Sequence, residues 1–190
     1  MKKVIFGSLL LALTFAGAAS STNAQMMKDE NPMVGGAAMY KTKNIVENAV
    51  NSKDHTTLVA AVQAAGLVDT LKSAGPFTVF APTNAAFDKL PPGTVETLVK
   101  PENKATLTKI LTYHVVAGNA DSKSIMKAIK KGGGKAEFKT VAGGTLTAMM
   151  DGKNLILTDE KGGRSMVTIA DVRQSNGVIH VIDSVLVPGS

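Results

Sequence analysis

The stretch GPFTVFAPTNAAF, at residues 75–87, contains a strand, a corner and the start of a helix. Its Gly-Pro pair interrupts the preceding structure, and the apolar and β-branched residues that include Phe80 favour an extended strand. Pro82 ends the strand because it has no backbone N–H to donate. Thr83 or Asn84 can then cap the first turn of a helix with its side-chain oxygen. The stretch therefore predicts a strand-to-helix corner.

Helical patterns lie on both sides of this corner. Before it, apolar residues recur at helical spacing from Asn44 onward, and Gly66 ends the longest segment. After it, Pro101 can open another long helix, because proline is tolerated in the first turn. Residues 113–116 then turn extended. The expected helical segments are 44–50, 54–65, 67–73, 83–90, 95–98, 101–111 and 122–129.

Strands and tight turns follow Gly134. The candidate strands are residues 136–141, 145–150, 154–158, 167–172 and 178–182, separated by glycine-containing turns. Asp151-Gly152 and Asn176-Gly177 are hairpin signals, because these residue types tolerate positive φ. The last strand does not alternate between apolar and polar residues, which indicates burial on both faces. We therefore expect an α+β protein in which helices pack around a small β-sandwich.

The first residues have the order of a secretory signal peptide. Lys2 and Lys3 precede an apolar run, and small residues follow up to Ala24. We expect residues 1–24 to be removed by cleavage near Ala24, with a cut near Ala18 or Ala19 as the alternative. A retained membrane anchor would need about 20 apolar residues, and this run is shorter. Residues 25–43 are expected to form a flexible leader that partly docks on the domain.

Composition narrows the function classes. The chain has 190 residues, a formal charge of +6 and no Cys, so it forms neither disulfides nor zinc-thiolate sites. Lysines are densest at residues 127–139, around three consecutive glycines. This lysine-rich stretch is either a solvated helix end or a contact patch for anionic glycans or a membrane surface. This stretch contains a single aromatic residue, Phe138, whereas a nucleic-acid groove stacks successive bases on several aromatic side chains, so no nucleic-acid partner is predicted.

Motifs for catalysis and metal binding are missing. The chain contains neither a Gly-x-Ser-x-Gly elbow nor a His-Glu-x-x-His sequence. His55 lies in a polar turn and is expected to be solvated. His114 and His180 lie in apolar runs, where a histidine is more often a hydrogen-bonded core residue than a ligand. No catalytic residue, metal site or cofactor is predicted.

Three segments resemble the fasciclin-like domain family. They are residues 75–87, residues 111–116 with the sequence LTYHVV, and residues 175–188 with the sequence SNGVIHVIDSVLVP. The resemblance covers about residues 44–188, and the leader residues 35–40 are also similar to single-domain exported bacterial members. It implies a wedge-shaped β-sandwich with helices around it. It also implies an adhesion or interaction role at cell surfaces or in extracellular matrix.

The resemblance also suggests site residues. Partner contact in animal relatives is attributed to positions that match Tyr113, His114, Asp171 and Val172 here. The matching structural positions are Phe80, Pro82, Thr83, Asn84, Asn176, Gly177 and His180.

The sequence supports three functions to different degrees. The first is a non-enzymatic adhesion domain, periplasmic or secreted, that binds a protein or glycan and has no membrane segment after signal cleavage. The alternative is a periplasmic or secreted protein that binds a small lipid, pigment or glycan in a cleft. The third is a hydrolase with His114 or His180 as its base. Nothing in the sequence predicts the oligomeric state.

Overall fold

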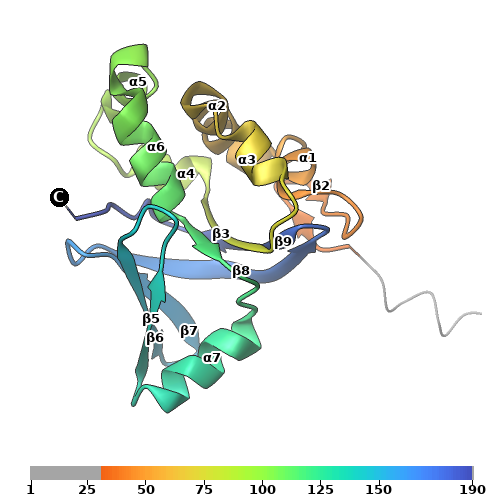
Figure 1. Cartoon of the computed structure of the whole chain (residues 1–190), viewed down its shortest axis with the longest axis vertical. Helices are drawn as coiled ribbons and strands as arrows, with labels where there is room; N and C mark the ends of the chain where they lie inside the picture. Colours follow the sequence, from red (N-terminus) through yellow and green to blue (C-terminus); the bar gives the residue numbers. More distant parts are fainter. Residues whose placement is uncertain (1–30, 190) are drawn as a thin grey trace, which may run out of the picture. The chain divides into compact units, whose positions relative to one another are not determined.

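The chain builds most of its helices first and most of its sheet afterwards (Figure 1). This computed structural model describes residues 31–189, so the expected signal peptide and the first part of the leader lie outside the described residues. The helices are α1 (Ile45–Ala49), α2 (Thr56–Ala65), α3 (Val68–Lys72), α4 (Asn84–Asp88), α5 (Thr94–Leu98), α6 (Lys104–Tyr113) and α7 (Ser122–Lys131). Short 3-10 turns are η2 (Lys53–His55) and η3 (Pro101–Asn103).

The main sheet has seven strands, and most of them come from the second half of the domain. A separate two-stranded ribbon comes from β1 (Met33–Val34) and β2 (Ala37–Ala38). The other strands are β3 (Phe77–Pro82), β4 (Val115–Ala117), β5 (Lys135–Lys139), β6 (Thr145–Asp151), β7 (Asn154–Thr158), β8 (Arg164–Gln174) and β9 (Gly177–Ile182). They pair in the order β4-β3-β9-β8-β7-β6-β5, and a bridge between Val116 and Thr140 nearly closes the sheet.

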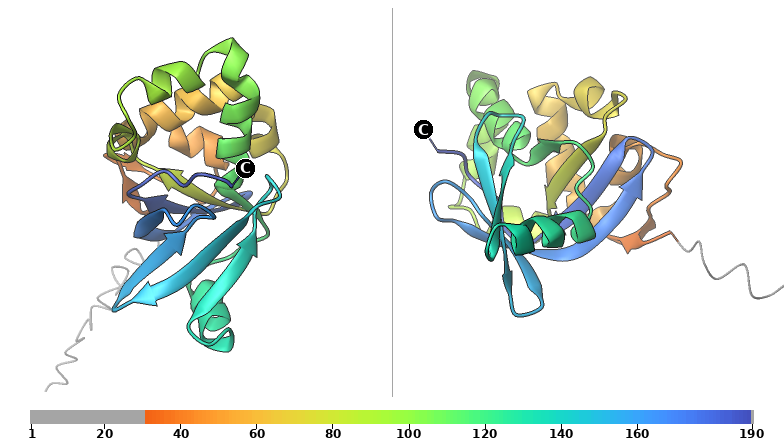
Figure 2. Two further views of the ribbon diagram at one scale, coloured as in Figure 1. Left: turned by 90° about the vertical axis from the view of Figure 1, so that its left-hand side faces the viewer. Right: turned by 60° about the horizontal axis from the view of Figure 1, so that its bottom comes forward.

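The pairing of β3 with β9 is the longest-range feature of the sheet. These two strands run parallel, whereas the other neighbours are antiparallel. Because they are central and covered on both faces, β9 is buried from Val178 to Ile182. This agrees with the expectation from its non-alternating sequence. Figure 2 shows α1 to α6 on one side of the sheet and α7 on the other.

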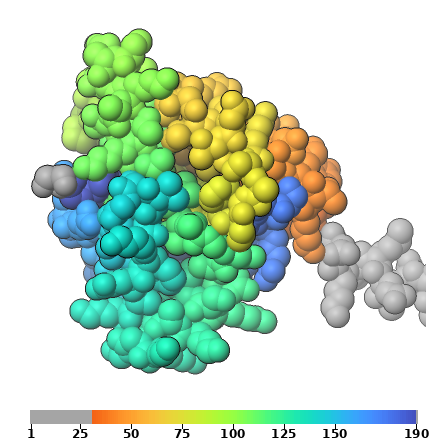
Figure 3. All heavy atoms as spheres, viewed as in Figure 1, coloured from red at the N-terminus to blue at the C-terminus, as the bar shows by residue number. Residues whose placement is uncertain are grey.

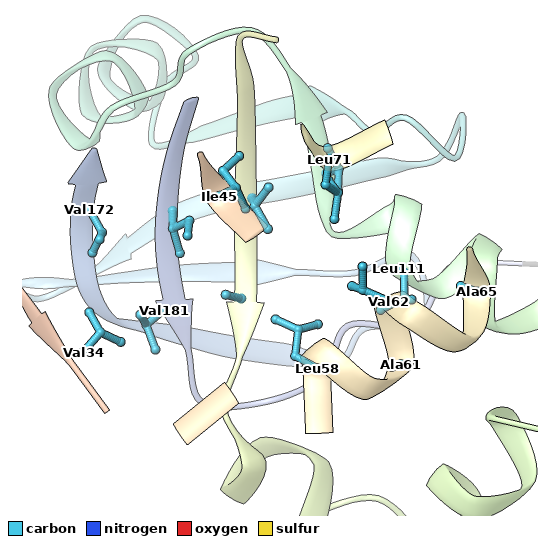
Figure 4. Close-up of a cluster of buried hydrophobic side chains, with 14 of the residues drawn as sticks. Val34, Ile45, Leu58, Ala61, Val62, Ala65, Leu71, Leu111, Val172 and Val181 are labelled. Carbon is cyan, nitrogen blue, oxygen red and sulfur yellow. The ribbon is translucent and has the colours of Figure 1, made fainter. Parts of the chain in front are cut away.

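Two hydrophobic clusters fill the domain. The first lies between the helices and the sheet, where Leu58, Val62, Leu71 and Leu111 point toward β3 and β9 (Figure 4). The second contains Tyr113, Phe80, Ile125, Ile129, Leu146, Leu157, Ile182 and Leu186, and joins α7 to β3, β6, β7 and β9. Their side chains come from both halves of the chain, so the domain folds as one unit from residue 31 onward.

Most of the predicted elements are present, with local differences. The α+β class and the strand-to-helix corner are confirmed: β3 ends at Pro82, and Thr83 caps α4 by accepting the N–H of Ala86 at 3.2 Å. Tyr113 and His114, expected in a strand, instead end α6. Residues 31–43 pack on the domain, with Val34 and Met39 buried. No helix among residues 31–189 is long and apolar enough to cross a membrane.

His55 corrects an expectation. It is 3% exposed rather than solvated, and its Nδ1 lies 2.8 Å from the hydroxyl of Ser52. The cause is tertiary: the ring lies in the wall of the first hydrophobic cluster, together with Val79 and Ala81 of β3. Burial lowers the pKa of His55, and the backbone of Ala81 and the charge of Asp54 offset part of that effect.

Candidate functional site

Residues 118–122, which lead into α7, are held by side chains of three sheet strands. The hydroxyl of Thr78 on β3 donates to the carbonyl of Gly118 at 2.7 Å and accepts the N–H of Ala120 at 2.8 Å. Nε2 of His180 on β9 donates to the carbonyl of Ala120 at 2.9 Å. These bonds pair backbone groups that lie outside any helix or strand. We call residues 118–122 the α7 entry segment.

Asp171 on β8 binds the last residue of this segment. Its carboxylate accepts the backbone N–H of Ser122 at 2.7 Å and also the Ser122 hydroxyl. Asp171 has a φ of 60°, a left-handed conformation that Asp adopts more readily than most residues. The conformation coincides with an irregularity in the pairing of β8 with β9, between Ile169 and Val172. The bulge thus directs the carboxylate to α7.

His180 on β9 connects Asp171 to the α7 entry segment. Its ring is fully buried, stacks on Phe80 with centroids 5.6 Å apart, and accepts the N–H of Asp171 at Nδ1 over 3.4 Å. Because Nε2 donates and Nδ1 accepts, the hydrogen bonds fix one neutral tautomer. Burial lowers the pKa of His180, while the Ala120 carbonyl and the charges of Asp171 and Asp121 offset part of that effect.

Tyr113 connects three parts of the second cluster. Its hydroxyl donates to the carbonyl of Thr145 at 2.7 Å and accepts the N–H of Glu160 at 3.2 Å. Its ring is fully buried, and burial raises the pKa of Tyr113 to about 12. The side chain therefore links the end of α6 to the start of β6 and to the turn between β7 and β8.

His114 points away from Tyr113, toward α6 and the end of the chain. Its Nδ1 lies 2.9 Å from the carbonyl of Ile110, and its Nε2 accepts the N–H of Leu186 at 3.0 Å. Burial lowers the pKa of His114 to about 4, against small opposing effects of the Ile110 carbonyl and Asp159. The ring is thus a neutral structural group at neutral pH.

Two asparagines among the predicted structural positions hold helix ends: Asn176 joins them to the turn between β8 and β9, and Asn84 joins α4 to α2. Asn176 accepts the N–H of Ile45 at 3.0 Å and donates to the carbonyls of Leu71 and Ser73 at 2.7 and 2.9 Å. Asn84 accepts the N–H of Thr57 at 3.0 Å, at the start of α2. Each amide satisfies helix-end groups that have no partner within their own helix.

Comparison with known proteins agrees with this architecture. The fasciclin domain family model matches residues 53–188. The chain belongs to the fasciclin domain family. The fold also matches a solved FAS1 domain pair from the insect cell adhesion molecule fasciclin I. That match has a TM-score of 0.68 and 18% identity, and it covers 76% of this chain and 50% of the other.

Relatives of this fasciclin domain occur in bacteria and animals. Protein sll1483 of Synechocystis is 47% identical over 161 residues, covering 84% of this chain and 82% of its own. Immunogenic protein MPB70 of Mycobacterium bovis is 39% identical over 145 residues, covering 74% and 66%. Human periostin is 36% identical over 137 residues, which are 72% of this chain but 15% of periostin.

The predicted partner-binding residues differ in accessibility. Tyr113, His114 and Val172 are at most 2% exposed, and Asp171 is partly exposed. Tyr113 and Val172 belong to different hydrophobic clusters. Among the hydrogen bonds of the described residues, none joins Tyr113 or His114 to Asp171. Direct partner contact at these four positions remains a prediction.

A cationic surface lies next to the α7 entry segment. Lys123, Lys127, Lys130 and Lys131 are exposed on α7. We call these four residues the lysine face. Lys135 and Lys139 of the adjoining β5 are also exposed, but they alternate with Ala136 and Phe138, which pack on the second cluster as α7 does, so they lie on the opposite side of β5. None of these lysines forms an ion pair with a residue in the described range. At helical spacing, the four lysines of α7 fall on one side, opposite the buried Ile125 and Ile129.

Sequence reasoning missed three residues of the site. Thr78 lies within the quoted stretch but was indistinguishable from any other strand residue. Ser122 was considered only as a helix start. Arg173, whose guanidinium lies 3.1 Å from Asp121 on the α7 entry segment, gave no signal at all. Their roles depend on contacts between distant parts of the sequence, with separations of 42 residues for Thr78, 49 for Ser122 and 52 for Arg173.

Proposed function

We propose that this fasciclin domain is an exported, non-enzymatic adhesion domain that binds a partner outside the cytoplasm through its lysine face. Two relationships support an extracellular role. A 32% identical relative from Mycobacterium bovis is named a cell surface glycolipoprotein, and the matching solved structure comes from a cell adhesion molecule.

The observation that carries the proposal is the way α7 is fixed. The α7 entry segment is bonded by Thr78, His180, Asp171 and Arg173, and the buried side of the helix packs into the second cluster. A cationic surface held in one geometry loses little conformational entropy of its backbone on binding. Among the residues that resemble partner-binding positions elsewhere, Asp171 supports the lysine face directly, through its bonds to Ser122.

The partner class follows from charge. Four exposed lysines on one side of α7, without ion-pair partners among the described residues, favour a partner with repeated negative charges. We infer that this partner is an acidic polysaccharide of cell surfaces or matrix. The carboxylates of such a polysaccharide repeat along its length, as the lysines repeat along α7. Such a polymer offers several weak contacts at once, and these combine into useful avidity.

A non-enzymatic role is supported by the state of the histidines. Both ring nitrogens of His114 and of His180 are engaged with backbone groups, so neither ring has a nitrogen available to activate a nucleophile. Among residues 31–189, no group of three His, Asp or Glu side chains is arranged to hold a metal ion.

Affinity chromatography on immobilised alginate, with uncharged dextran as the blank resin, tests the proposal. We expect retention on alginate that falls steeply as salt is raised, because exposed charges are screened within about 8 Å at physiological ionic strength. The double substitution Lys127→Glu/Lys131→Glu should abolish retention. The control Lys100→Glu/Lys104→Glu changes the net charge equally at other exposed positions and should keep most of it. Equal loss in both variants would reduce the effect to net charge and contradict a specific face.

Export has its own test. We propose cleavage near Ala24 and release into the periplasm or the medium. N-terminal sequencing of protein recovered outside the cytoplasm should begin at Gln25, or near residue 19 for the alternative cut. A mature chain that begins at Met1 would contradict export by cleavage.

A further inference from the structure

An apolar cavity of about 210 Å³ lies in the first hydrophobic cluster, away from the lysine face. Its walls come from α1, α2, α3 and α6 and from the helix-facing side of β3 and β9. Five of the lining residues are among the side chains drawn in Figure 4: Ile45, Leu58, Val62, Leu71 and Leu111. The proposed adhesion role uses none of them.

Three polar side chains of the cavity wall, Ser52, His55 and His114, form hydrogen bonds within the protein. Ser52 and His55 face each other at 2.8 Å, and His114 is bonded to Ile110 and Leu186. Nε2 of His55 is the one buried side-chain nitrogen of the wall without a hydrogen-bond partner. Most of the remaining wall is hydrocarbon, which offers water few of the two to four polar partners that it needs.

The rim of the cavity combines exposed apolar residues with one cation. Val50 and Val141 are 51% and 48% exposed, although exposed valines are usually scattered rather than grouped around an opening. Lys72, at the end of α3, is the one charged residue among those that line the cavity, because His55 and His114 are neutral. On the face drawn in Figure 3, α3, α6 and the segment around residue 141 lie next to one another.

We propose that this cavity binds the hydrocarbon chain of a single-chain carboxylic acid, with the carboxylate at the rim beside Lys72. The apolar walls accept the chain, and the rim lysine complements the head group. A carboxylate placed instead against Nε2 of His55 would be buried among hydrocarbon at a large desolvation cost. The head group therefore stays at the opening. This site is independent of the lysine face.

The volume sets the length of chain that fits. An engineered cavity of about 150 Å³ holds one benzene molecule, so 210 Å³ accommodates about eight carbon atoms by proportion. A second apolar cavity of about 160 Å³ adjoins the first and shares Leu111 and His114 with it. A longer chain would have to displace this shared wall. We therefore expect octanoate and decanoate to bind more tightly than butanoate or palmitate.

Isothermal titration calorimetry of the purified protein with decanoate tests the proposal. Wild type should bind, and Ala49→Phe, which places a ring in the cavity wall, should weaken binding at least about tenfold, the scale of a lost apolar site. Ala64→Phe makes the same change at an exposed position of α2 outside the wall and should bind as wild type does. Absence of binding by wild type at millimolar decanoate, or unchanged binding by Ala49→Phe, would overturn the proposal.

Two further measurements are needed. The first distinguishes the contribution of the ligand's carboxylate from that of its hydrocarbon chain, and the second uses wild type alone, so that it does not depend on whether a variant folds. Lys72→Gln should weaken decanoate about two- to fivefold, as expected for an exposed ion pair, and leave 1-decanol unchanged. Equal effects on both ligands would refute the assignment of the carboxylate to Lys72. In wild type, decanoate should shift the methyl resonances of Leu58, Val62 and Leu71. Shifts confined to other residues would place the ligand elsewhere and contradict the proposal whether or not Ala49→Phe folds.

Discussion

Nε2 of His114 accepts the backbone N–H of Leu186 at 3.0 Å, so the residue that ends α6 holds the last segment of the described chain against the second cluster. Nδ1 of the same ring is 2.9 Å from the carbonyl of Ile110 and must donate to it. One nitrogen donates and the other accepts, which is possible only for neutral imidazole. Protonation of the ring would replace the Leu186 bond with two facing donors.

This geometry predicts a loss of stability in mild acid. The pKa of His114 is lowered from 6.5 to about 4 in the folded chain, so the unfolded chain binds the extra proton first as pH falls. The stabilising contribution is therefore complete above pH 6.5 and is lost between pH 6.5 and about 4. Linkage puts the full loss at about 3 kcal/mol. Urea unfolding between pH 7 and 4 measures it as a decrease in the free energy of unfolding.

The variant His114→Gln identifies the titrating group. It should be less stable than wild type at pH 7, because glutamine cannot reproduce both bonds, but its stability should fall less steeply over this pH range. Some slope must remain, since burial also lowers the pKa values of His55 and His180. A slope identical to that of wild type would show that His114 does not carry the effect.

The bond between Asp171 and Ser122 predicts an energetic coupling between β8 and α7. Asp171→Ala removes two acceptors and leaves alanine at a φ of 60°, so we expect a loss of about 2–4 kcal/mol. Ser122→Ala keeps the backbone N–H and should cost about 1 kcal/mol. The double mutant should be less destabilised than the sum by about 1 kcal/mol. Urea unfolding of the four proteins gives this coupling, and additivity would disprove the connection.

Asp171→Asn provides the matched control for the backbone conformation. Asparagine tolerates the left-handed region and keeps one oxygen for the Ser122 N–H. It should therefore cost less than alanine. If alanine and asparagine were equally destabilising, the carboxylate charge would be the whole contribution of Asp171.

The sequence predicted those parts of the fold that depend on neighbours along the chain. The corner at Pro82 and Thr83 is local, because the cap bond reaches only three residues ahead to Ala86. The order of helices before strands and the burial of β9 also follow from composition and alternation. The three segments that resemble the fasciclin-like family predict the overall fold of residues 44–188, beyond what these local patterns indicate.

Tertiary contacts explain what sequence reasoning could not supply. The parallel pairing of β3 with β9 joins residues about 100 positions apart, and no local pattern specifies a partner at that distance. His55 looked solvated because its neighbours in sequence are polar, whereas its neighbours in space are apolar. Tyr113 and His114 share a sequence motif yet face different parts of the core, since they lie at the end of a helix rather than in a strand.

Gly177 gives the last prediction. The pair Asn176-Gly177 predicts a hairpin turn at these two residues, but the turn consists of Ser175 and Asn176. Gly177 is the first residue of β9 and pairs with Gln174. A Cβ at Gly177 would lie 2.0 Å from the carbonyl oxygen of Phe77 on the parallel strand β3. Because glycine has no side chain, β9 can begin directly beside Phe77, the first residue of β3. Glycine is therefore required here by the close approach of the two backbones and not by its backbone φ angle.

Gly177→Ala should therefore cost about 3 kcal/mol or more, because backbone atoms of a central strand must move to make room. Gly152→Ala is the matched control: it has a φ of 59° and no atom within 4 Å of the added Cβ, so only backbone strain of about 1 kcal/mol is expected. Urea unfolding of both variants at pH 7 compares the two costs. Equal destabilisation would mean that β3 and β9 separate easily, and the close approach at Phe77 would lose its role in specifying the central pair of strands.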